Sequence, residues 1–363
     1  MVDWLAGKRM RGTSTERTGS YMPEVGGWVE LARTTLSSAG DNITVSSLSD
    51  KRYYMVLQDF IPDTYAAPRM RLGNGSADTG SNYSDRRNEN GGTDATRTSQ
   101  TSMINTPEGG GNPQFIVSYI ANLSGKEKLC MHHSVHRKNA GAANAAGRGE
   151  AVSKWGNTSN PLDVVDIFNN DAGAGDFASG SEVVVLGYDP DDTHTTNFWE
   201  ELTTKTSTSE ANTLTTDTVT AKKYNWVQVH IPYTTGSANN YNFRVGNSTI
   251  DTGSNYCQRY SIDGGADGTQ TSQGYVRMSW NISTGSEWMF ANIFFINNAS
   301  NEKLFISHAN RNNTSGAGTA PHRYEVVGKW ANTSNQANVF QILHQTGASN
   351  LGTGSIIKWW GAD

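Results

Sequence analysis

The sequence predicts an all-β protein made of two tandem copies of one antiparallel β-sandwich domain of jelly-roll type, preceded by an N-terminal arm. Three observations support this fold class. A long internal repeat divides the chain, strand-length apolar runs alternate with turn residues, and helical three-four periodicity is nearly absent. Charged residues make up only 17% of the chain, below the roughly 25% of an average protein, while Gly, Ser, Thr and Asn fill the segments between apolar runs.

The repeat consists of motifs that return in the same order over the whole length. Asp-Thr-Gly-Ser-Asn-Tyr occurs at 78–83 and again at 251–256, an offset of 173 residues. Lys-Trp, one further residue and Asn-Thr-Ser-Asn occur at 154–160 and at 329–335, an offset of 175. Only short loop insertions therefore separate the copies. Because this period is far longer than the roughly 20–50 residues of solenoid units, we expect each copy to form its own core.

The repeat also sets the predicted domain boundaries. Residues 1–24 form the arm, residues 25–190 the first sandwich, residues 191–196 an acidic and polar linker, and residues 197–363 the second sandwich. Each sandwich is long enough to bury most of the surface that its unfolded chain exposes, without metals or disulfides. Since the linker is short, we expect the two copies to lie close together.

Within each copy the apolar runs have the length of strands. Residues 53–57 and 224–229 carry β-branched and aromatic residues, and the second run alternates between apolar and polar side chains. Residues 115–120 and 288–296 are richer in aromatics, as expected for central strands of a sandwich. Further runs of the first copy lie at 129–135, 164–168 and 183–186. About nine or ten strands are expected in each copy.

Composition also limits the functional classes. The net charge is −5 and the basic residues of the domains are not clustered, so a nucleic-acid partner is not expected. No run of about 18 apolar residues occurs, and the N-terminus lacks the apolar stretch of a secretory signal. We expect a soluble chain with no membrane span, made without export through a signal peptide. Cys130 and Cys257 occupy non-equivalent positions, which argues against a shared disulfide or a duplicated zinc site.

The most strongly repeated stretch is also the most polar. Oxygen-bearing side chains bracket pairs of glycines in both copies, and calcium is coordinated by oxygen ligands. The calcium candidates are Asp78, Asn82, Asp94, Asp251, Asn255 and Asp267. The alternatives are a partner-binding loop and a structural loop held by Asx-turns, glycines with positive φ and an aspartate–arginine pair. The spacing differs from that of an EF-hand, so the structural loop is favoured.

Residues 130–136 contain three histidines and at first suggest a metal site. Only His133 has a histidine counterpart, at His308, and a duplicated site would need its ligands twice. Histidines exposed on or beside a strand are therefore expected, and no metal is predicted.

Charged and aromatic residues recur together near the end of each copy. Arg148 and Glu150 lie two positions apart on a predicted strand, so they are expected to pair on its solvent side. Trp155 and Trp330 follow lysines and are candidate binding or interface residues. Their rings could stack on a sugar or form a cation–π contact, but packing in a core or interface is favoured.

No sequence pattern indicates catalysis. The chain has no Gly-x-Ser-x-Gly elbow, no phosphate-binding loop and no His-Glu-x-x-His pair. The adjacent acids Glu200 and Glu201 have no counterpart pair in the first copy. Glycosidase carboxylates come together only in space, so this class stays open. We expect no enzyme, no catalytic metal and no cofactor.

The repeated motifs, the arm sequence at 4–17 and the closing Gly-Ser-Glu-Val-Val-Val-Leu-Gly at 180–187 resemble tandem-repeat structural proteins of marine viruses and phages. The resemblance covers nearly the whole chain. It implies a virion protein of tail-fibre, head-fibre, spike or capsid-decoration type, with outward sandwiches that bind a host surface. Residues 1–24 would anchor it to other virion proteins. The basic residues of this arm are Lys8, Arg9, Arg11 and Arg17. No catalytic residues come with the resemblance.

Two other interpretations stay open. A double jelly-roll major capsid protein would also be a duplicated sandwich of this length, with its arm under the shell. The similar loops of the two copies favour an appendage, because a capsid subunit must make different contacts from each half. A carbohydrate-binding or carbohydrate-active protein would be favoured by acids that converge in a cleft or by tryptophans exposed in a row. For a virion protein we expect self-association, first of all as a trimer.

Overall fold

A computed structural model of the protein describes most of the chain. The described residues are 27–63, 65–106, 110–171, 177–189, 196–236, 240–280, 288–312, 316–345 and 349–363. They contain no helix, and they form antiparallel sheets that build two sandwiches, so the predicted fold class is confirmed. The predicted arm and all but the last residue of the predicted linker lie outside the described residues.

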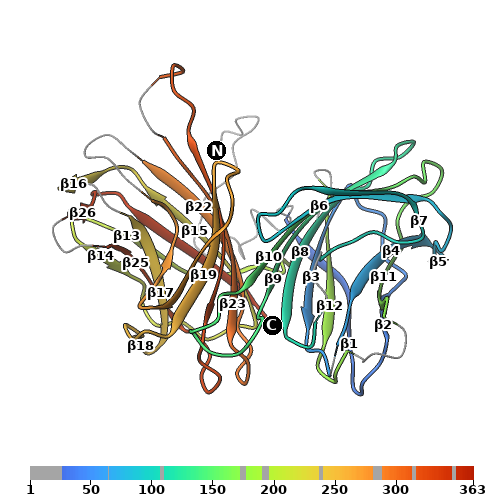
Figure 1. Ribbon diagram of the computed structural model, residues 1–363, viewed down its shortest axis with the longest axis horizontal. Helices are drawn as coiled ribbons and strands as arrows, with labels where there is room; N and C mark the ends of the chain where they lie inside the picture. Colours follow the sequence, from blue (N-terminus) through green and yellow to red (C-terminus); the bar gives the residue numbers. More distant parts are fainter. Residues whose placement is uncertain are drawn as a thin grey trace, which may run out of the picture.

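The first copy is a sandwich of two antiparallel sheets (Figure 1). Its large sheet has eight strands in the order β1-β12-β3-β8-β9-β10-β6-β7, and its small sheet has four in the order β2-β11-β4-β5. The strands are β1 (Val29–Thr35), β2 (Asn42–Val45), β3 (Tyr53–Phe60), β4 (Pro68–Asn74), β5 (Ser76–Ala77), β6 (Tyr83–Glu89), β7 (Ala95–Gln100), β8 (Gln114–Ala121), β9 (Lys128–His136), β10 (Gly147–Trp155), β11 (Val164–Asn169) and β12 (Glu182–Tyr188).

The second copy repeats this arrangement. Its large sheet has the order β13-β27-β15-β22-β23-β24-β19-β20, which is the order of the first large sheet with each strand replaced by its repeat equivalent. The strands are β13 (Glu200–Thr206), β14 (Thr213–Thr215), β15 (Tyr224–Ile231), β16 (Thr234–Gly236), β17 (Tyr241–Asn247), β18 (Thr249–Ile250), β19 (Tyr256–Ile262), β20 (Gly268–Gln273), β21 (Val276–Arg277), β22 (Met289–Ile296), β23 (Lys303–Arg311), β24 (His322–Trp330), β25 (Val339–His344), β26 (Ser349–Leu351) and β27 (Ile356–Ala362).

Each sandwich encloses an apolar core between its own two sheets, as expected from the repeat. In the first copy, Val56 of β3 and Ile116 of β8 face Ile167 of β11 across this core. Successive residues of a strand point to opposite faces of a sheet. The neighbours of Val56, which are Met55 and Leu57, therefore point outward, and they are nevertheless buried.

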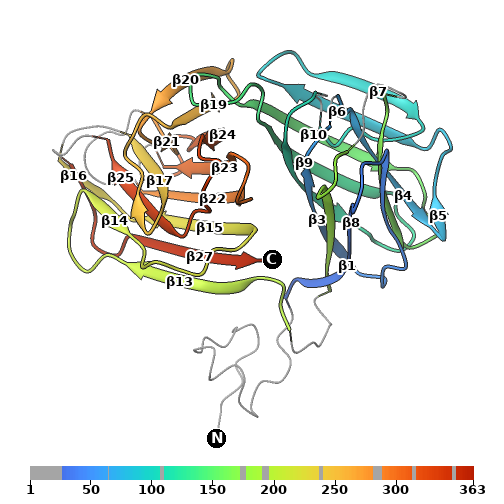
Figure 2. The ribbon, with the colours of Figure 1, turned by 90° about the horizontal axis from the view of Figure 1, so that it is seen from below.

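A third core joins the two copies and buries these outward residues. The two large sheets face each other across the centre of the molecule (Figures 1 and 2). The buried apolar residues between them are Met55, Leu57, Phe115, Val117, Val135, Ala146, Val184, Leu186, Trp199, Tyr224, Phe294, Ile296, Leu304, Ile306, Val327 and Ala362. Because the central strands are covered on both faces, their sequences are nearly continuous apolar runs.

Buried polar contacts border this shared core. Glu182, at the start of β12, accepts hydrogen bonds from the Tyr224 hydroxyl at 2.7 Å and from Lys223 Nζ at 3.0 Å. The same Nζ lies 3.2 Å from a carboxylate oxygen of Asp59, which also accepts a hydrogen bond from Asn298 Nδ2 at 2.9 Å. Two carboxylates of the first domain are thus paired with hydrogen-bond donors of the second domain.

The two copies do not use equivalent surfaces in this contact. Leu129 on β9 is 58% exposed, whereas its equivalent Leu304 on β23 is 1% exposed. Conversely, Leu57 is buried in the shared core, and its equivalent in the second copy is the polar residue Gln228. The contact is therefore heterologous, meaning that the two copies use different rows of residues on equivalent outer faces.

This asymmetry predicts unequal effects of the same substitution in the two copies. Leu304→Ala should destabilise the protein by about 2–5 kcal/mol, because it removes buried methyl groups and leaves a cavity. Leu129→Ala, at the equivalent exposed position, should change stability by no more than about 0.5 kcal/mol. Urea unfolding of both variants measures the difference. Equal losses would contradict the described packing of the two sheets.

Candidate functional site

The outer face of the first large sheet is only partly covered by the second copy. Cross-strand neighbours on this face form rows that run from β12 across β3, β8, β9 and β10. Two adjacent rows are partly open to solvent, because Tyr53, Leu129, Met131 and Val152 are at least 40% exposed while Leu186 and Met55 are buried in the shared core. One contains Tyr188, Tyr53, Ala121, Leu129 and Lys154, and the next contains Leu186, Met55, Tyr119, Met131 and Val152. These rows are the repeat equivalents of the face that the second copy buries against the first.

The other residues of these rows line a groove of about 840 Å³, which we call the apolar groove. Aromatic rings gather at its β12 end, where Tyr188 lies 5.7 Å from Trp28 and 6.2 Å from Tyr53 between ring centroids. Cationic side chains lie at the opposite end. Lys154 is paired with Glu127 at 2.9 Å, and the largely exposed Arg86 lies 3.7 Å from Asp94. The groove therefore combines a broad apolar floor with an aromatic end and an end where basic side chains are paired with acidic ones.

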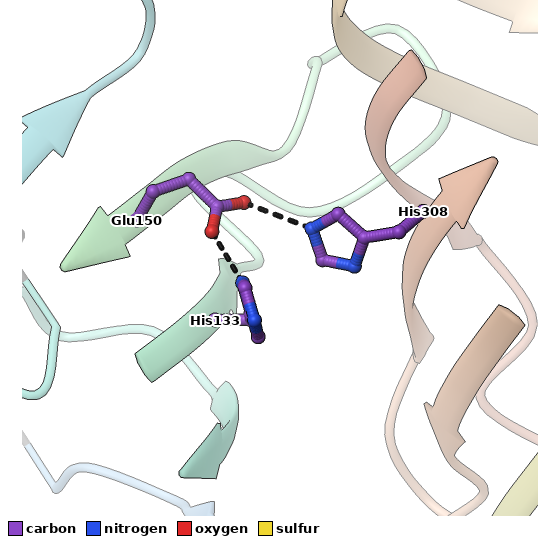
Figure 3. Close-up of side chains that lie close together, drawn as sticks. All are labelled: His133, Glu150 and His308. Carbon is purple, nitrogen blue, oxygen red and sulfur yellow. Dashed lines mark hydrogen bonds and ion pairs between the residues drawn. The ribbon is translucent and has the colours of Figure 1, made fainter. Parts of the chain in front are cut away.

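Three side chains meet at the border between the shared core and the apolar groove (Figure 3). His133 on β9 and Glu150 on β10 are direct partners in the antiparallel ladder, and His308 on β23 reaches the same carboxylate from the second copy. His133 Nδ1 is hydrogen-bonded to one carboxylate oxygen of Glu150, and His308 Nε2 lies 3.4 Å from the other. The two imidazole centroids are 4.3 Å apart. One carboxylate thus bridges two imidazoles from different domains.

Arg148 lies next to this group of three side chains. It donates two hydrogen bonds to Asp267, at 2.7 and 3.2 Å, and one to Glu325 at 3.0 Å. Its Nη1 also lies 3.7 Å from Glu150. The predicted pair between Arg148 and Glu150 is present, but its predicted place on the solvent side is wrong. The second copy covers this part of the sheet, and the arginine side chain is only 4% exposed.

A second cavity of about 460 Å³ opens beside the three side chains and is lined by both copies. His133 and Glu150 form part of its wall on one side, and Glu325 does so on the other. The turn after β6 in the first copy packs closely against Asp267 of the second copy at this cavity. Gly91 has a φ of 72°, and a Cβ atom at this position would lie 2.5 Å from the backbone nitrogen of Asp267. Only glycine allows this approach.

Electrostatics favour an ionised carboxylate at the centre of the site. Burial raises the pKa of Glu150, but the charges and hydrogen bonds of His133 and His308 outweigh burial and hold its pKa well below the ordinary value. Burial lowers the pKa of His133, while the charge and hydrogen bond of Glu150 more than compensate and leave its pKa raised. Among the described residues, this is the one group of three His, Cys, Asp or Glu side chains with ligand atoms close enough to share a metal ion.

The expectation of exposed histidines in residues 130–136 is wrong for two of the three. His132 is fully buried, with Nδ1 2.8 Å from Ser118 Oγ and Nε2 2.7 Å from Ser153 Oγ. His136 is 4% exposed. Because side chains alternate along β9, His132 points into the first sandwich and His133 points toward the second domain.

Trp155 and Trp330 are core residues, so their candidate role as a binding surface is wrong. Their side chains are 1% and 2% exposed. Trp155 Nε1 donates to Asp78 at 2.7 Å, and Trp330 Nε1 donates to Asp251 at the same distance. Each aspartate also accepts hydrogen bonds from a backbone N–H and an asparagine side chain two and four residues later. The repeated motif is an Asx-turn tied to a buried tryptophan.

The calcium candidates do not converge in either copy. Asp78 and Asn82 precede β6, whereas Asp94 lies beyond the opposite end of that strand. In the second copy Asp251 and Asn255 likewise precede β19, and Asp267 is bound by Arg148. Hydrogen bonds occupy the carboxylates of the two turn aspartates. The geometry therefore supports the structural-loop alternative.

The predicted arm contacts fall outside the described residues. They are Lys8, Arg9, Arg11 and Arg17. For the part of the chain that is described, no helix has the length and hydropathy that crossing a bilayer requires.

The cysteines and the buried serine–histidine contact are poorly placed for nucleophilic chemistry. Burial raises the pKa of Cys130 to about 12 and that of Cys257 to about 11, so both thiols stay protonated at neutral pH. The contact of Ser118 with His132 lies inside the first sandwich, where both side chains are fully buried and away from any substrate.

Comparison with known proteins adds little to this description. No family model matches the chain, and no curated protein does either. Mouse laminin alpha1 chain domains LG4-5 are 10% identical, with 98% of this chain and 93% of that chain covered and a TM-score of 0.21. Alginate lyase Aly36B is 14% identical, with 43% and 76% covered and a TM-score of 0.20. Scores this low carry no argument about fold or function.

Sequence reasoning missed the meeting of His133, Glu150 and His308. The signal was the duplication itself, because His133 and His308 are equivalent positions and so are Glu150 and Glu325. A ligand set was sought within each copy, whereas the structure assembles one site from both.

The buried histidines predict a loss of stability in acid. Burial lowers the pKa of His132 to about 3 and those of His136 and His344 to about 4, against about 6.5 in an unfolded chain. At a pH between the folded and the unfolded pKa, these histidines bind more protons in the unfolded state than in the folded state. Their contribution to the free energy of unfolding is therefore complete above pH 6.5 and is lost as the pH falls toward 4. At pH 5 each of the three histidines should lower the free energy of unfolding by about 2 kcal/mol relative to neutral pH.

Urea unfolding at pH 7 and pH 5 measures this effect, and His132→Gln isolates one group. The variant should lose about 2 kcal/mol less than the parent between the two pH values. An identical loss in parent and variant would show that His132 does not titrate as described.

Proposed function

We propose that the chain is a structural protein of a virus particle, of fibre, spike or capsid-decoration type, which binds a protein partner through the apolar groove. The observation that carries the proposal is the relation between the two large sheets. The face that forms the apolar groove in the first copy is, in the second copy, buried against the other domain of the same chain. A face of this composition suits protein contacts, and large exposed apolar patches mark such sites.

The shared core supports the same proposal. Two domains that bury a common apolar layer form one stiff body, whereas freely hinged domains bury little surface against each other. Such a body suits a component that must hold a fixed shape in a particle. In this proposal residues 1–24 tether the body to other virion proteins, and the apolar groove supports self-association, with a trimer as the first expectation.

The major capsid protein remains the alternative within the same setting. The likeness of the loops favours an appendage only if the two halves make similar contacts. They do not, because the contact between them uses different rows of residues on the two outer faces. The choice between appendage and capsid therefore depends on where the protein lies in the particle.

Glycan binding is the second candidate, and a specific feature favours it. Trp28, Tyr53 and Tyr188 present rings at one end of the apolar groove, where sugar faces could stack. Arg86 and Lys154 at the other end would suit an acidic sugar. Trp28→Ala should abolish binding to acidic oligosaccharides on a glycan array, whereas a virion partner alone would leave the array silent.

Deletion of residues 1–24 tests the tether. Because both sandwiches have complete cores without these residues, the truncated protein should unfold at the same temperature as the full chain. It should fail to enter particles, which mass spectrometry of purified virions measures. Antibody labelling of intact particles would then distinguish vertices, tail tips and the whole shell. Normal incorporation of the truncated protein would overturn the tether.

Leu129→Glu tests the apolar groove. The side chain is 58% exposed, so a carboxylate there should leave folding intact while blocking an apolar partner. Self-association, measured by sedimentation of the full chain, should weaken by at least about tenfold, as for loss of a modest interface contact. Phe290→Glu is the matched control, because Phe290 is 38% exposed on the second copy. Equal behaviour of both variants and the parent would argue against the groove.

A further inference from the structure

We propose that His133, Glu150 and His308 form a binding site for one divalent transition-metal ion, best suited to Zn²⁺, which bridges the two domains. The site is separate from the partner-binding role of the apolar groove, and it departs from the sequence-based expectation of a chain without metal. Its ligands come from three strands and from both copies.

The donor set is the first argument. Two imidazole nitrogens and a carboxylate oxygen are ligands that zinc takes in sites with an open fourth position. The candidate ligand atoms lie within 4.8 Å of one another. Bonds of about 2.0–2.2 Å place zinc ligands roughly 3.3–3.6 Å apart, so small side-chain rotations close the difference. The adjacent cavity, which both copies line, leaves room for a water molecule as the fourth ligand.

Rigid placement is the second argument. His133 and Glu150 face each other across the ladder of β9 and β10, with further strands on both sides. His308 lies on β23, which is also a central strand of its sheet. Sites on such elements hold their geometry better than sites on loops. Only the contact between the two domains can bring the third ligand into place.

The charge of the central ligand is the third argument. Glu150 is the anionic member of the three-residue group, and its carboxylate lies between the two imidazoles. A divalent cation there would gain a charged ligand, whereas an anion would be repelled by it.

Zinc titration of the full chain, after removal of bound metal with a chelator, tests the proposal. Isothermal titration calorimetry should give one Zn²⁺ per chain, and Co²⁺ should bind in competition and produce the visible absorption of a four-coordinate site. Because the ion binds only the joined domains, saturating Zn²⁺ should raise the melting temperature. His308→Ala should weaken zinc binding by at least about 100-fold, since even outer contacts of metal ligands can be worth that much.

His322→Ala is the matched control. His322 also pairs with a carboxylate, that of Asp263 at 2.8 Å, but it lies outside the three-residue group. This variant should bind zinc like the parent. Glu150→Gln provides a second test if His308→Ala fails to fold, because it keeps the shape of the side chain while removing its charge. Absence of stoichiometric zinc binding, or undiminished binding by both site variants, would overturn the proposal and leave a metal-free hydrogen-bonded cluster.

Discussion

Burial of the outward faces of the two large sheets is the constraint on which the rest of the structure depends. A sandwich of this kind is complete once its inner core is covered, and its outer faces can remain polar. Here the outer faces carry residues such as Leu57 and Val184 in the first copy and Phe294 and Ile306 in the second. Burying these apolar side chains away from water is favourable, and in this chain each outer face is buried against the other domain. The position of the ionic contacts around Glu182 and Arg148 follows from that packing.

The duplication and the strand lengths could be predicted from sequence because they depend on local patterns that recur twice. The turn at Asp78 was also predictable in kind, since Asp followed by Gly and Asn suits an Asx-turn. The partner of that turn, Trp155, could not be predicted, because a contact across 77 positions has no local signature. The same limit applies to His133, whose neighbours in space come from two domains. The apolar groove could not be predicted from sequence, because the equivalent faces of the two copies carry similar apolar residues although one is exposed and the other is buried.

Equivalent residues therefore serve different purposes in the two domains. The pairs Lys154 with Glu127 and Lys329 with Glu302 occupy matching positions, yet the first is exposed and the second is buried under the loop that follows β9. Lys329 Nζ donates hydrogen bonds to the carbonyl oxygens of Arg137 and Asn139 in that loop, whereas the equivalent Lys154 is exposed to solvent. An identical motif is thus a surface ion pair in one copy and an interface contact in the other.

The use of different rows on the two outer faces has a consequence for assembly. A head-to-tail contact that does not close on itself can repeat without limit, so that identical units would grow into a filament. In the second copy, the positions equivalent to the rows that receive the second domain are polar. Where the first copy presents Leu57, Val117 and Val184, the second presents Gln228, Asn292 and Lys358. These three polar residues leave the second copy without the apolar surface on which the first copy receives its neighbour, so the contact between the domains cannot be repeated in the same way on the second copy.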